Sequence, residues 1–591
     1  MKNTFAEKIL GAPAGAIVFK RPDIILTHDN TASIHKTFEK MGGEKIADPD
    51  QLLIVLDHNA PPTSAKLASQ YQDIRNIVKD QGVSKFYDAG RGICHQIMSY
   101  HARPGMVIVG SDSHTCTAGA FNAFAAGIDR TESAGLWKKS ETWFRVPESM
   151  KITLHGSLPD GVFAKDISLY IIGKIGSAGA DYLSIEYHGD GVDGLSISDR
   201  MTLANLASEM GAKNAVFPPD KVLLEFLKED AVGFWADEDA SYVKELEINL
   251  SELYPLVAAP HNVDNVKGIS EVIGKTVHQG LIGTCTNGRI EDIRIAAAIL
   301  LGKQIKSGFQ LLVIPASKEI YQQAIKEGLV SNLLDSGANF LSSSCGPCLG
   351  TGQGIPADGY TVISTANRNF KGRMGNPKSE IYLASPATVA CSALNGTITD
   401  PREIQGNEIF TADRGESITP EIPAGESRRS NAVWNYQDQH NVNTDQMFAG
   451  SLTYSVLSSD GEAIMPHLFA GFDPDFSPSV KTGDILIAGD NFGCGSSREH
   501  PAVGLAYAGV KAVIVRSTNR IFYRSSINQG LALIVHPEAV DAYKSGDTVG
   551  IEFDEGIIII GNKHFNFEPL PDKLMQIINK KGLVNWIKDS D

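Results

Sequence analysis

The sequence predicts an α/β protein made of several domains. Short apolar runs alternate with helical stretches almost throughout the chain, which is typical of parallel sheets covered by helices. The 591 residues correspond to about four domains at roughly 150 residues each. Apolar residues make up 42% of the chain and charged residues 21%, as in ordinary globular proteins, and these fractions exclude a disordered or fibrous chain.

Polar clusters follow four of the expected strands. Apolar runs at 52–56, 106–109, 281–282 and 360–363 lead into polar residues at 57–58, 110–115, 283–287 and 364–369. Ligands of open parallel sheets bind beyond the carboxyl ends of the strands. The four clusters therefore predict one shared cleft.

A change of composition between about 400 and 440 predicts a linker. Prolines and glycines are interspersed there with charged residues and show no sustained period. A second α/β unit is expected beyond it, with strands near 484–488, 512–515 and 531–535. The isoleucine run 557–560 is expected in a late hairpin, and the sequence contains no internal repeat.

The net charge and the cysteine content of the chain indicate where the protein is located and which classes of partner it can bind. The net charge of −16 argues against broad binding to a phosphate backbone, although a local cluster of arginines can reverse the sign inside a cleft. No apolar run reaches the 18 or so residues that span a bilayer, and the apolar stretch 9–19 runs into KRPD rather than a cleavage site. Seven cysteines, a small and odd number, do not form a disulfide framework. We therefore expect a cytoplasmic protein with no nucleic-acid or membrane partner.

Three cysteines have several competing interpretations. Cys345 and Cys348 form a CxxC pair, and Cys285 lies 60 residues upstream. A structural zinc site would normally have a fourth ligand at short spacing, and a thioredoxin-like redox pair would leave Cys285 unexplained. Burial as a small apolar side chain fits better the other four cysteines, which are Cys94, Cys116, Cys391 and Cys494. A further interpretation is an iron–sulfur cluster on three thiolates, in which one iron keeps an open position and acts as a Lewis acid.

Five motifs bear on this choice. They are GSDSHTCT at 110–117, GTCTNG at 283–288, SCGPCLG at 344–350, NRNFKGR at 367–373 and NFGCGSSREH at 491–500. With these motifs in this order the sequence resembles the aconitase superfamily of hydro-lyases, which includes aconitase, homoaconitase and isopropylmalate isomerase. The resemblance covers nearly the whole chain and is closest to the large and small subunits of isopropylmalate isomerase fused into one polypeptide.

The resemblance implies three α/β domains around a [4Fe–4S] cluster and a mobile C-terminal α/β swivel domain. The expected domains and linker are 1–130, 131–277, 278–400, the linker 401–440, and the swivel domain 441–591. The implied cluster ligands, which leave one iron open, are Cys285, Cys345 and Cys348.

The chemistry of the superfamily moves water across a carbon–carbon bond through an enoate. It needs a base for a weakly acidic proton, an acid for the departing hydroxyl and cations for the carboxylates. Ser496 matches the base of the family, and backbone donors of its turn together with Arg498 would have to stabilise the alkoxide. His58, oriented by Asp57, matches the acid. The resemblance adds a hydrogen-bond network around the hydroxyl that contains His95, Asp112, His114 and Glu209.

Polar side chains are expected to hold the substrate and the cluster. Arginine suits carboxylates because its planar fork makes two parallel hydrogen bonds. The resemblance assigns substrate binding to His28, Ser113, Arg368, Arg373, Ser497 and Arg498. It places beside the cluster Asn205, Asn287 and Asn367. Asn205 and Glu209, on a helix expected to start near Ser198, would project from one face.

A loop early in the swivel domain sets substrate choice in the family, and tricarboxylate-using members place an arginine there. The corresponding stretch is NTDQMFAGSLTYSV at 443–456, and residues 431–497 contain no arginine and a single lysine, Lys481. Without a cation, the third carboxylate of a tricarboxylate would lose its ion pair, which costs on the order of 2–5 kcal/mol of binding free energy in a desolvated site. We therefore expect a hydroxy-dicarboxylate of the malate type, such as 3-isopropylmalate or a dimethylmalate. The loop also differs from the usual isopropylmalate sequence, so aconitase or homoaconitase activity is the alternative if another domain supplies a cation.

Two non-enzymatic classes are also considered. Some members of the superfamily lose the cluster and bind RNA, but they are much longer and the acidity of this chain disfavours that role. A zinc-stabilised binding protein would contain zinc without acid-labile sulfide. We expect an enzyme that acts as a monomer on a small hydroxy-di- or tricarboxylate and needs no separate small subunit.

Overall fold

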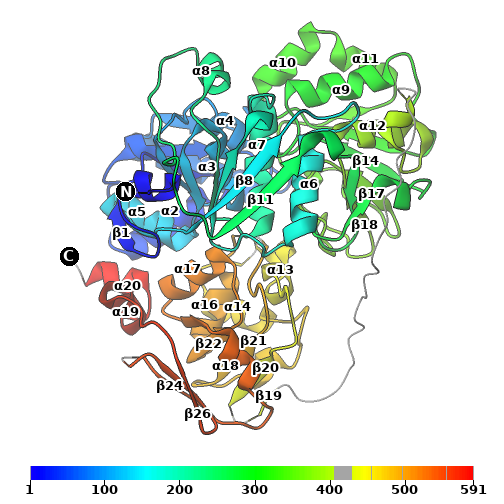
Figure 1. Ribbon diagram of the computed structural model, residues 1–591. Coiled ribbons are helices and arrows are strands. Elements are labelled where there is room, and N and C mark those ends of the chain that lie inside the picture. The colour runs from blue at the N-terminus through cyan, green and yellow to red at the C-terminus, as the bar shows by residue number, and fades with distance from the viewer. Residues whose placement is uncertain are drawn as a thin grey trace.

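The computed structural model describes residues 2–404, 429–430, 432–453, 456–495, 497–553 and 555–589. Four sheets in this part of the chain are wholly or mainly parallel, and helices pack on them, which confirms the α/β class. Figure 1 shows two bodies. The N-terminal body contains the residues up to 404, and the C-terminal body contains those from 429 onward. No described helix is both long and apolar enough to cross a membrane.

The first sheet of the N-terminal body is parallel and has the strand order β4-β3-β2-β5-β6. Its strands are β2 (Ile24–Thr27), β3 (Leu52–Val55), β4 (Lys85–Tyr87), β5 (Val107–Gly110) and β6 (Phe124–Gly127). The helices of this region are α1 (Phe5–Leu10), α2 (Thr31–Lys40), α3 (Ala65–Gln81), α4 (Cys94–Met98) and α5 (Arg130–Lys139). Ile25 and Ile54 join one apolar core while Leu26 and Leu53 join another, so both faces of the sheet are covered. An antiparallel pair of strands, β1 (Ile17–Lys20) and β7 (Thr142–Arg145), lies at its margin.

The second and third sheets share one apolar core, which runs from Met150 to Leu383. The second sheet is parallel and consists of β8 (Ser149–His155), β9 (Ser184–His188), β10 (Asn214–Val216) and β11 (Lys244–Asn249). The third has the order β13-β12-β18-β17-β14-β15-β16 and consists of β12 (Leu256–Ala258), β13 (Val266–Gly268), β14 (Gln279–Ile282), β15 (Gln310–Val313), β16 (Asn339–Phe340), β17 (Thr361–Ser364) and β18 (Glu380–Leu383). The helices are α6 (Ala164–Ile175), α7 (Ile197–Leu206), α8 (Lys221–Leu227), α9 (Ile290–Leu300), α10 (Lys318–Lys326), α11 (Leu329–Asp335) and α12 (Pro386–Asn395).

The C-terminal body is built on a five-stranded sheet with the order β19-β20-β21-β22-β23. Its strands are β19 (Arg429–Ser430), β20 (Val433–Tyr436), β21 (Ile485–Ala488), β22 (Ala512–Val515) and β23 (Ala532–Val535). The helices are α13 (Thr444–Met447), α14 (Gly461–Ile464), α15 (Phe476–Ser479), α16 (His500–Tyr507), α17 (Arg520–Asn528) and α18 (Pro537–Ala542). An antiparallel sheet of β24 (Val549–Glu552), β25 (Ile557–Ile560) and β26 (Lys563–Asn566) follows, and the isoleucine run forms β25 as expected.

The structure differs from the expected linker at one end. Strands β19 and β20 lie within 401–440 but pair with the sheet of the C-terminal body, because the run 433–436 is apolar enough to be buried beside β21. Residues 405–428, the middle of the expected linker, lie outside the described residues. The domain boundaries themselves stay a prediction.

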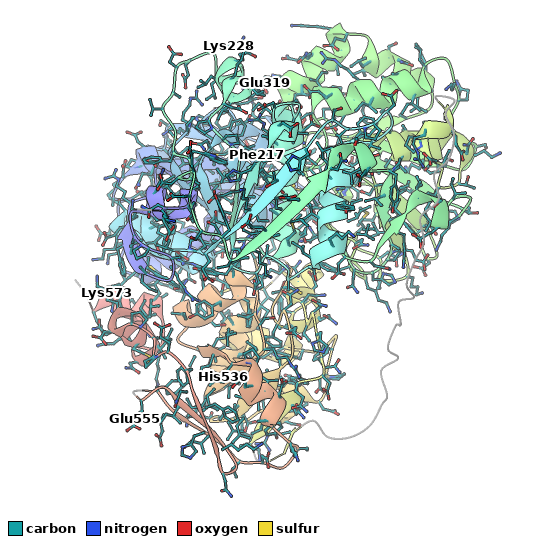
Figure 2. The ribbon with its side chains drawn as sticks, in the orientation of Figure 1. Phe217, Lys228, Glu319, His536, Glu555 and Lys573 are labelled. Carbon is teal, nitrogen blue, oxygen red and sulfur yellow. The ribbon has the colours of Figure 1, made fainter. Side chains whose placement is uncertain are left out.

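The last two helices connect the C-terminal body to the N-terminal body. Helices α19 (Asp572–Asn579) and α20 (Leu583–Lys588) lie beside the N-terminal region in Figure 1. Leu574 and Ile587 join the same apolar core as Leu136 and Phe144. The ammonium group of Lys573, labelled in Figure 2, lies 4.1 Å from the ring centroid of Phe19. Helices α19 and α20 therefore pack on the N-terminal body.

A buried ion pair also joins the two bodies. Nε of Arg524 in α17 donates to Oε2 of Glu132 in α5 at 2.9 Å, and both side chains are 1% exposed. The guanidinium also donates to the carbonyl oxygen of Trp143 at 2.9 Å and lies 3.8 Å from the centroid of its ring. Arg524 thus neutralises a carboxylate that water does not reach.

Arg524→Met is expected to lower the free energy of unfolding by about 3–5 kcal/mol, because it leaves the Glu132 carboxylate buried without its cation. Urea unfolding followed by circular dichroism measures this loss. Arg294→Met is the matched control, since Arg294 pairs with Glu327 at the surface, where the side chains are 46% and 31% exposed. The control is expected to cost less than about 1 kcal/mol. Equal losses in the two variants would contradict the role given to the buried pair.

Candidate active site

A cavity of about 770 Å³, measured with its open mouth, lies between the two bodies. Residues from all four polar clusters at the strand ends line it, which confirms the shared cleft. The residues singled out from the sequence that line the cavity are His28, Asp57, His58, His95, Asp112, Ser113, His114, Cys285, Cys345, Cys348, Asn367, Arg368, Arg373, Ser497 and Arg498.

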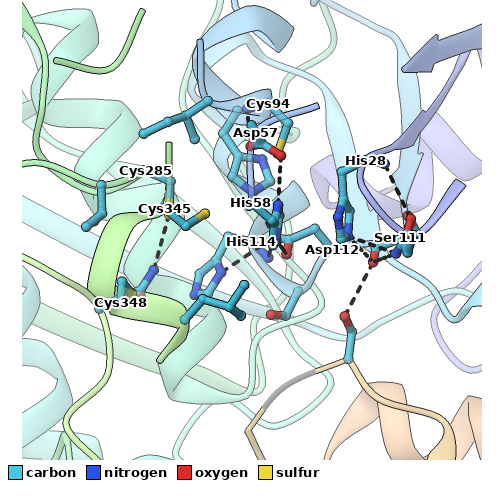
Figure 3. Close-up of a pocket in the computed structure, with 18 of the residues that line it drawn as sticks. His28, Asp57, His58, Cys94, Ser111, Asp112, His114, Cys285, Cys345 and Cys348 are labelled. Atoms are coloured by element: carbon cyan, nitrogen blue, oxygen red, sulfur yellow. Dashed lines mark hydrogen bonds and ion pairs between the residues drawn. The ribbon is translucent and has the colours of Figure 1, made fainter. Parts of the chain in front are cut away.

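A buried Asp–His pair follows β3. Nδ1 of His58 and Oδ1 of Asp57 are 2.7 Å apart, and the other carboxylate oxygen of Asp57 accepts the backbone N–H of Cys94 at 2.7 Å (Figure 3). Nε2 of His58 lies 3.5 Å from Asp112. Burial opposes protonation of His58, but the nearby Cys345 and the Asp57 carboxylate outweigh it, so the pKa of His58 is well above its usual value. The imidazole is therefore held in a fixed orientation and favours its protonated form.

His28 packs flat against His58. The two ring centroids are 3.8 Å apart with an interplanar angle of 12°. Nε2 of His28 lies 2.8 Å from the side-chain nitrogen of Asn30 and 3.3 Å from the carbonyl oxygen of Ser111. Burial, and then the neighbouring His58, lower the pKa of His28 to about 3. His28 is therefore neutral and contributes a polar, uncharged side chain to the lining of the cavity.

A second network contains the other two histidines. Nε2 of His95 lies 2.7 Å from Oδ1 of Asp112, and the same oxygen accepts the backbone N–H of His114 at 2.8 Å. Nε2 of His114 lies 2.8 Å from Glu209, and Nε of Arg368 donates to the same carboxylate at 3.0 Å. Burial raises the pKa of Glu209, but Arg368 and His114 outweigh it and bring the pKa to about 2. Glu209 is thus an anion that links a histidine to an arginine of the cavity.

The three cysteines share one side of the cavity. Cys345 and Cys348 flank a tight turn in which Gly346 has φ +53°, and a Cβ there would lie 2.4 Å from Ile314. Cys285 follows β14, a strand of the third sheet. Burial, and then the nearby Cys348, raise the pKa of Cys285 to about 12. Burial also raises the pKa of Cys345, so Cys285 and Cys345 are poor thiolates unless a cation binds them.

Side-chain donors point at these sulfur atoms. The amides of Asn205 and Asn367 each donate to Sγ of Cys285 at 3.3 Å. Nη2 of Arg373 lies 3.8 Å from Sγ of Cys348. Hydrogen bonds to sulfur favour the thiolate form and tune a bound metal group.

The C-terminal body closes the cavity with the segment after β21. Gly495 has φ +97°, a left-handed conformation that suits glycine, and it precedes the turn that carries Ser497 and Arg498. Oγ of Ser497 donates to the carbonyl oxygen of Ser111 at 3.4 Å, across the two bodies. Nη1 of Arg498 lies 2.6 Å from Oδ1 of Asp445 in α13. Ser496, the expected base, lies outside the described residues.

Two expected positions differ from the structure. Helix α7 ends at Leu206, and Glu209 lies in the 3-10 turn that follows, so Asn205 and Glu209 do not share one helix face. The 3-10 turn extends over Ala207–Met210 and ends at Gly211, which adopts a left-handed conformation. The amide of Asn287 donates to Asp292 at 3.0 Å and does not point at a cysteine sulfur in any described contact. The Asn287 amide, which was expected beside the cluster, therefore binds Asp292 in the first turn of α9.

Several residues of the cavity region were not predicted from the sequence, and four of them are polar. Asn30, Arg130 and Thr453 line the cavity, and Asp445 binds Arg498 beside it. Arg130 follows strand β6, so the rule that found the other strand-end clusters could have found it. Asp445 lies in the stretch 443–456, where the absence of a cation was the feature that bore on the substrate.

Comparisons with known proteins agree with this site. The aconitase family (aconitate hydratase) matches residues 3–278 and 272–396, and the aconitase C-terminal domain matches 473–539. The 3-isopropylmalate dehydratase large subunit 1 of Methanopyrus kandleri is 46% identical over 415 residues, which are 68% of this chain and 99% of that protein. A probable methanogen homoaconitase large subunit of Methanosarcina mazei is 46% identical over 389 residues, 65% of this chain and 99% of that protein.

One solved structure is similar to a part of this chain. It is a 3-isopropylmalate dehydratase (leuD) from Methanocaldococcus jannaschii, 39% identical in sequence, with a TM-score of 0.24, and it covers 26% of this chain and 89% of its own. The family matches extend over both bodies of the chain and include the strand ends that form the cavity. The chain therefore belongs to the aconitase family of hydro-lyases.

Proposed function

We propose that this protein is a [4Fe–4S]-dependent hydro-lyase that dehydrates and rehydrates a malate-type hydroxy acid through an enoate. One observation carries the proposal: three cysteines, the His58–Asp57 pair and three arginines of the family motifs line one cavity. The names of its relatives, 3-isopropylmalate dehydratase and homoaconitase, support substituted malates as the substrate class. Aconitase or homoaconitase activity is the alternative within the same chemistry.

The residues on the cysteine side fit the cluster that the family implies. Cys285, Cys345 and Cys348 would hold it, because they are the cysteines that line the cavity together with amide and guanidinium donors to sulfur. Cys94, the other cysteine of the lining, donates its backbone N–H to Asp57 and belongs to the histidine side. When bound, a cluster on three thiolates supplies an open iron that polarises the substrate hydroxyl as a Lewis acid.

His58 supplies the proton for the departing hydroxyl in this proposal. Asp57 fixes its Nδ1, which leaves Nε2 directed toward Asp112 and the cavity. A protonated imidazole beside two carboxylates can give up its proton as the carbon–oxygen bond breaks and take it back on hydration. His95, Asp112 and His114 keep the surrounding hydrogen bonds in one arrangement.

The substrate carboxylates are held by arginines in this proposal. Arg368 is fixed by Glu209 and by Oγ of Ser113 at 3.2 Å, Arg498 by Asp445, and Arg373 lies beside Cys348. Preorganised guanidinium groups stabilise the negative charge that develops on the carboxylate when the neighbouring carbon loses its proton. Ser496 would remove that proton, and its neighbours Ser497 and Arg498 both line the cavity.

The proposal is tested with anaerobically reconstituted protein and ultraviolet detection of the enoate. The substrate panel contains 3-isopropylmalate, 2,3-dimethylmalate, isocitrate, citrate and homocitrate. Turnover of at least one of them, with activity that follows the iron and acid-labile sulfide content, is the expected result. A preparation with four iron and four sulfide per chain that turns over none of these acids would refute the proposed function.

A single chain would suffice for this activity. Ser497 and Arg498, together with Gly450 and Thr453, come from the C-terminal body and line a cavity whose other lining residues belong to the N-terminal body. The relatives named above are large subunits that correspond to about two thirds of this chain. We infer that the C-terminal body supplies here what a separate small subunit would supply.

A further inference from the structure

A fully buried lysine lies close to the cysteine side of the cavity. Lys165, in the first turn of α6, is 0% exposed and is not among the residues that line the cavity. Its ammonium group donates to the carbonyl oxygens of Thr365 at 2.9 Å and of Ala366 at 2.6 Å. These two residues follow β17 and directly precede Asn367 and Arg368, both of which line the cavity. Lys165 therefore binds the backbone of a turn that carries two cavity residues.

The same turn is joined to the proposed cluster ligands. Oγ1 of Thr365 accepts the N–H of Gly283, two residues before Cys285, at 2.9 Å. The amide nitrogen of Asn367 donates to Sγ of Cys285 at 3.3 Å, and its oxygen lies 3.7 Å from Sγ of Cys348. Hydrogen bonds thus connect the ammonium group, through one short turn, to two of the three sulfur atoms.

Among the described residues, no carboxylate forms an ion pair with Lys165, whose acceptors are the two carbonyl oxygens. The carboxylate of the neighbouring Asp166 accepts the N–H groups of Leu256 and Phe163, both at 2.9 Å. A buried charge is normally paired with an opposite charge or bound to a metal group, because its removal from water is costly. An anion that binds near Lys165 would supply the counter-charge.

The groups that favour the charged form of Lys165 most strongly are cysteines. Burial lowers the pKa of Lys165 to about 7. The nearby Cys285, Cys348 and Glu209, in that order, oppose this lowering. Glu209 already pairs with Arg368, at 3.0 Å. Cysteines that bind iron are thiolates at neutral pH, so a cluster on them places negative charge near Lys165 and favours its ammonium form.

We propose that Lys165 is the counter-charge of the iron–sulfur cluster, held by two carbonyl oxygens of the turn before Asn367, and that it raises the reduction potential of the cluster. This inference rests on the proposed function, which supplies the cluster, and adds a residue that acts on it from outside the cavity. Lys165 acts through the cluster and does not touch the substrate, so it is a positioning residue and not a catalytic one.

Loss of this charge has a defined effect on the cluster. Net charge is one of the factors that set the reduction potential of an iron–sulfur cluster. Reduction adds one negative charge, and a fixed cation in a buried site stabilises the reduced form relative to the oxidised one. The same cation favours an electron-poor open iron, which is what polarisation of a substrate hydroxyl requires.

The test compares the wild-type holoenzyme with Lys165→Met, which removes the charge, and Lys165→Arg, which keeps it. Each protein is titrated anaerobically with dithionite in the presence of redox mediators, and the reduced cluster is counted by electron paramagnetic resonance. Lys165→Met is expected to shift the equilibrium toward the oxidised cluster about tenfold, which for one electron is a potential about 59 mV more negative. Lys165→Arg is expected to stay within about threefold of wild type, because its charge is the same.

Lys213→Met is the matched control. Lys213 is also 0% exposed, but the charged groups near it are Arg524, Arg520 and Glu132, and none of them is a cysteine. This control is expected to keep the wild-type potential. Circular dichroism of each apoprotein shows whether the variant folds.

Two outcomes of the titration would overturn the inference: an unchanged potential in Lys165→Met, or an equal shift in Lys213→Met. If Lys165→Arg took up a cluster and Lys165→Met did not, the need for the charge would be supported. Lack of uptake by both variants would assign Lys165 a structural role and would also overturn the inference. All these outcomes leave the hydro-lyase activity standing, whereas a wild type that binds no iron and sulfide on reconstitution would refute the proposed function itself.

Discussion

Replacing Cys345 by serine is expected to remove the cluster and the activity together. A serine oxygen is a poor ligand for iron that thiolates hold, and Cys345 flanks a turn that leaves little room for a shifted ligand, because Gly346 packs against Ile314. Without the Lewis acid, turnover is expected to fall on the order of 100-fold or more. Iron and acid-labile sulfide analysis, visible absorption and activity are measured on the same preparation.

Cys391→Ala is the matched control for this variant. Cys391 is fully buried in α12 and does not line the cavity. Its replacement is expected to leave the cluster absorption and the activity unchanged. A Cys345→Ser enzyme that retains its activity would exclude the three-cysteine assignment, and zinc without sulfide in the wild type would favour a zinc-stabilised protein.

Replacing Ser496 by alanine is expected to abolish turnover while the cluster absorption stays intact. General base catalysis contributes about 10²- to 10⁴-fold, and the variant lacks the hydroxyl that would remove the proton from carbon. The flanking residues support this role: Ser497 and Arg498 line the cavity, and Ser497 binds the N-terminal body. Loss of activity with an unchanged visible spectrum separates a base from a cluster ligand.

Ser477→Ala is the control for Ser496→Ala, since Ser477 lies in α15 of the same body and donates to the carbonyl oxygen of Met465. It is expected to keep full activity. Exchange of solvent deuterium into the substrate carbon gives an independent readout, and it is expected to stop in Ser496→Ala. Loss of the cluster in Ser496→Ala would show that Ser496 has a structural role instead.

The strand ends of the fold could be predicted from the sequence because their signal is local. An apolar run followed by polar residues identified β3, β5, β14 and β17, and those ends meet in the cavity. Cys285 and His58 were found in this way together with the family motifs. Each of these residues lies directly after its strand, so no tertiary information was needed to place it near the sheet edge.

The remaining features depend on contacts between distant segments. Thr453 lines the cavity from a loop of the C-terminal body, and no local pattern reports where that loop docks. Asn287 turns away because Asp292 offers it a carboxylate at 3.0 Å. Glu209 leaves the helix of Asn205 because α7 tightens into a 3-10 turn, which changes the spacing per turn from 3.6 residues to about 3. The rule that residues four apart share a helix face assumes a continuous α-helix, and it fails where an α-helix becomes a 3-10 helix.

Docking of α19 and α20 on the N-terminal body has a consequence for how the enzyme behaves on dilution. The two bodies belong to one polypeptide, so translation fixes their stoichiometry at one to one. Their association is intramolecular, and its extent does not depend on the protein concentration. Leu574 and Ile587 add a second attachment at the far end of the C-terminal body. Specific activity is therefore expected to stay constant at concentrations where a two-subunit enzyme would separate and lose the residues that its smaller partner contributes.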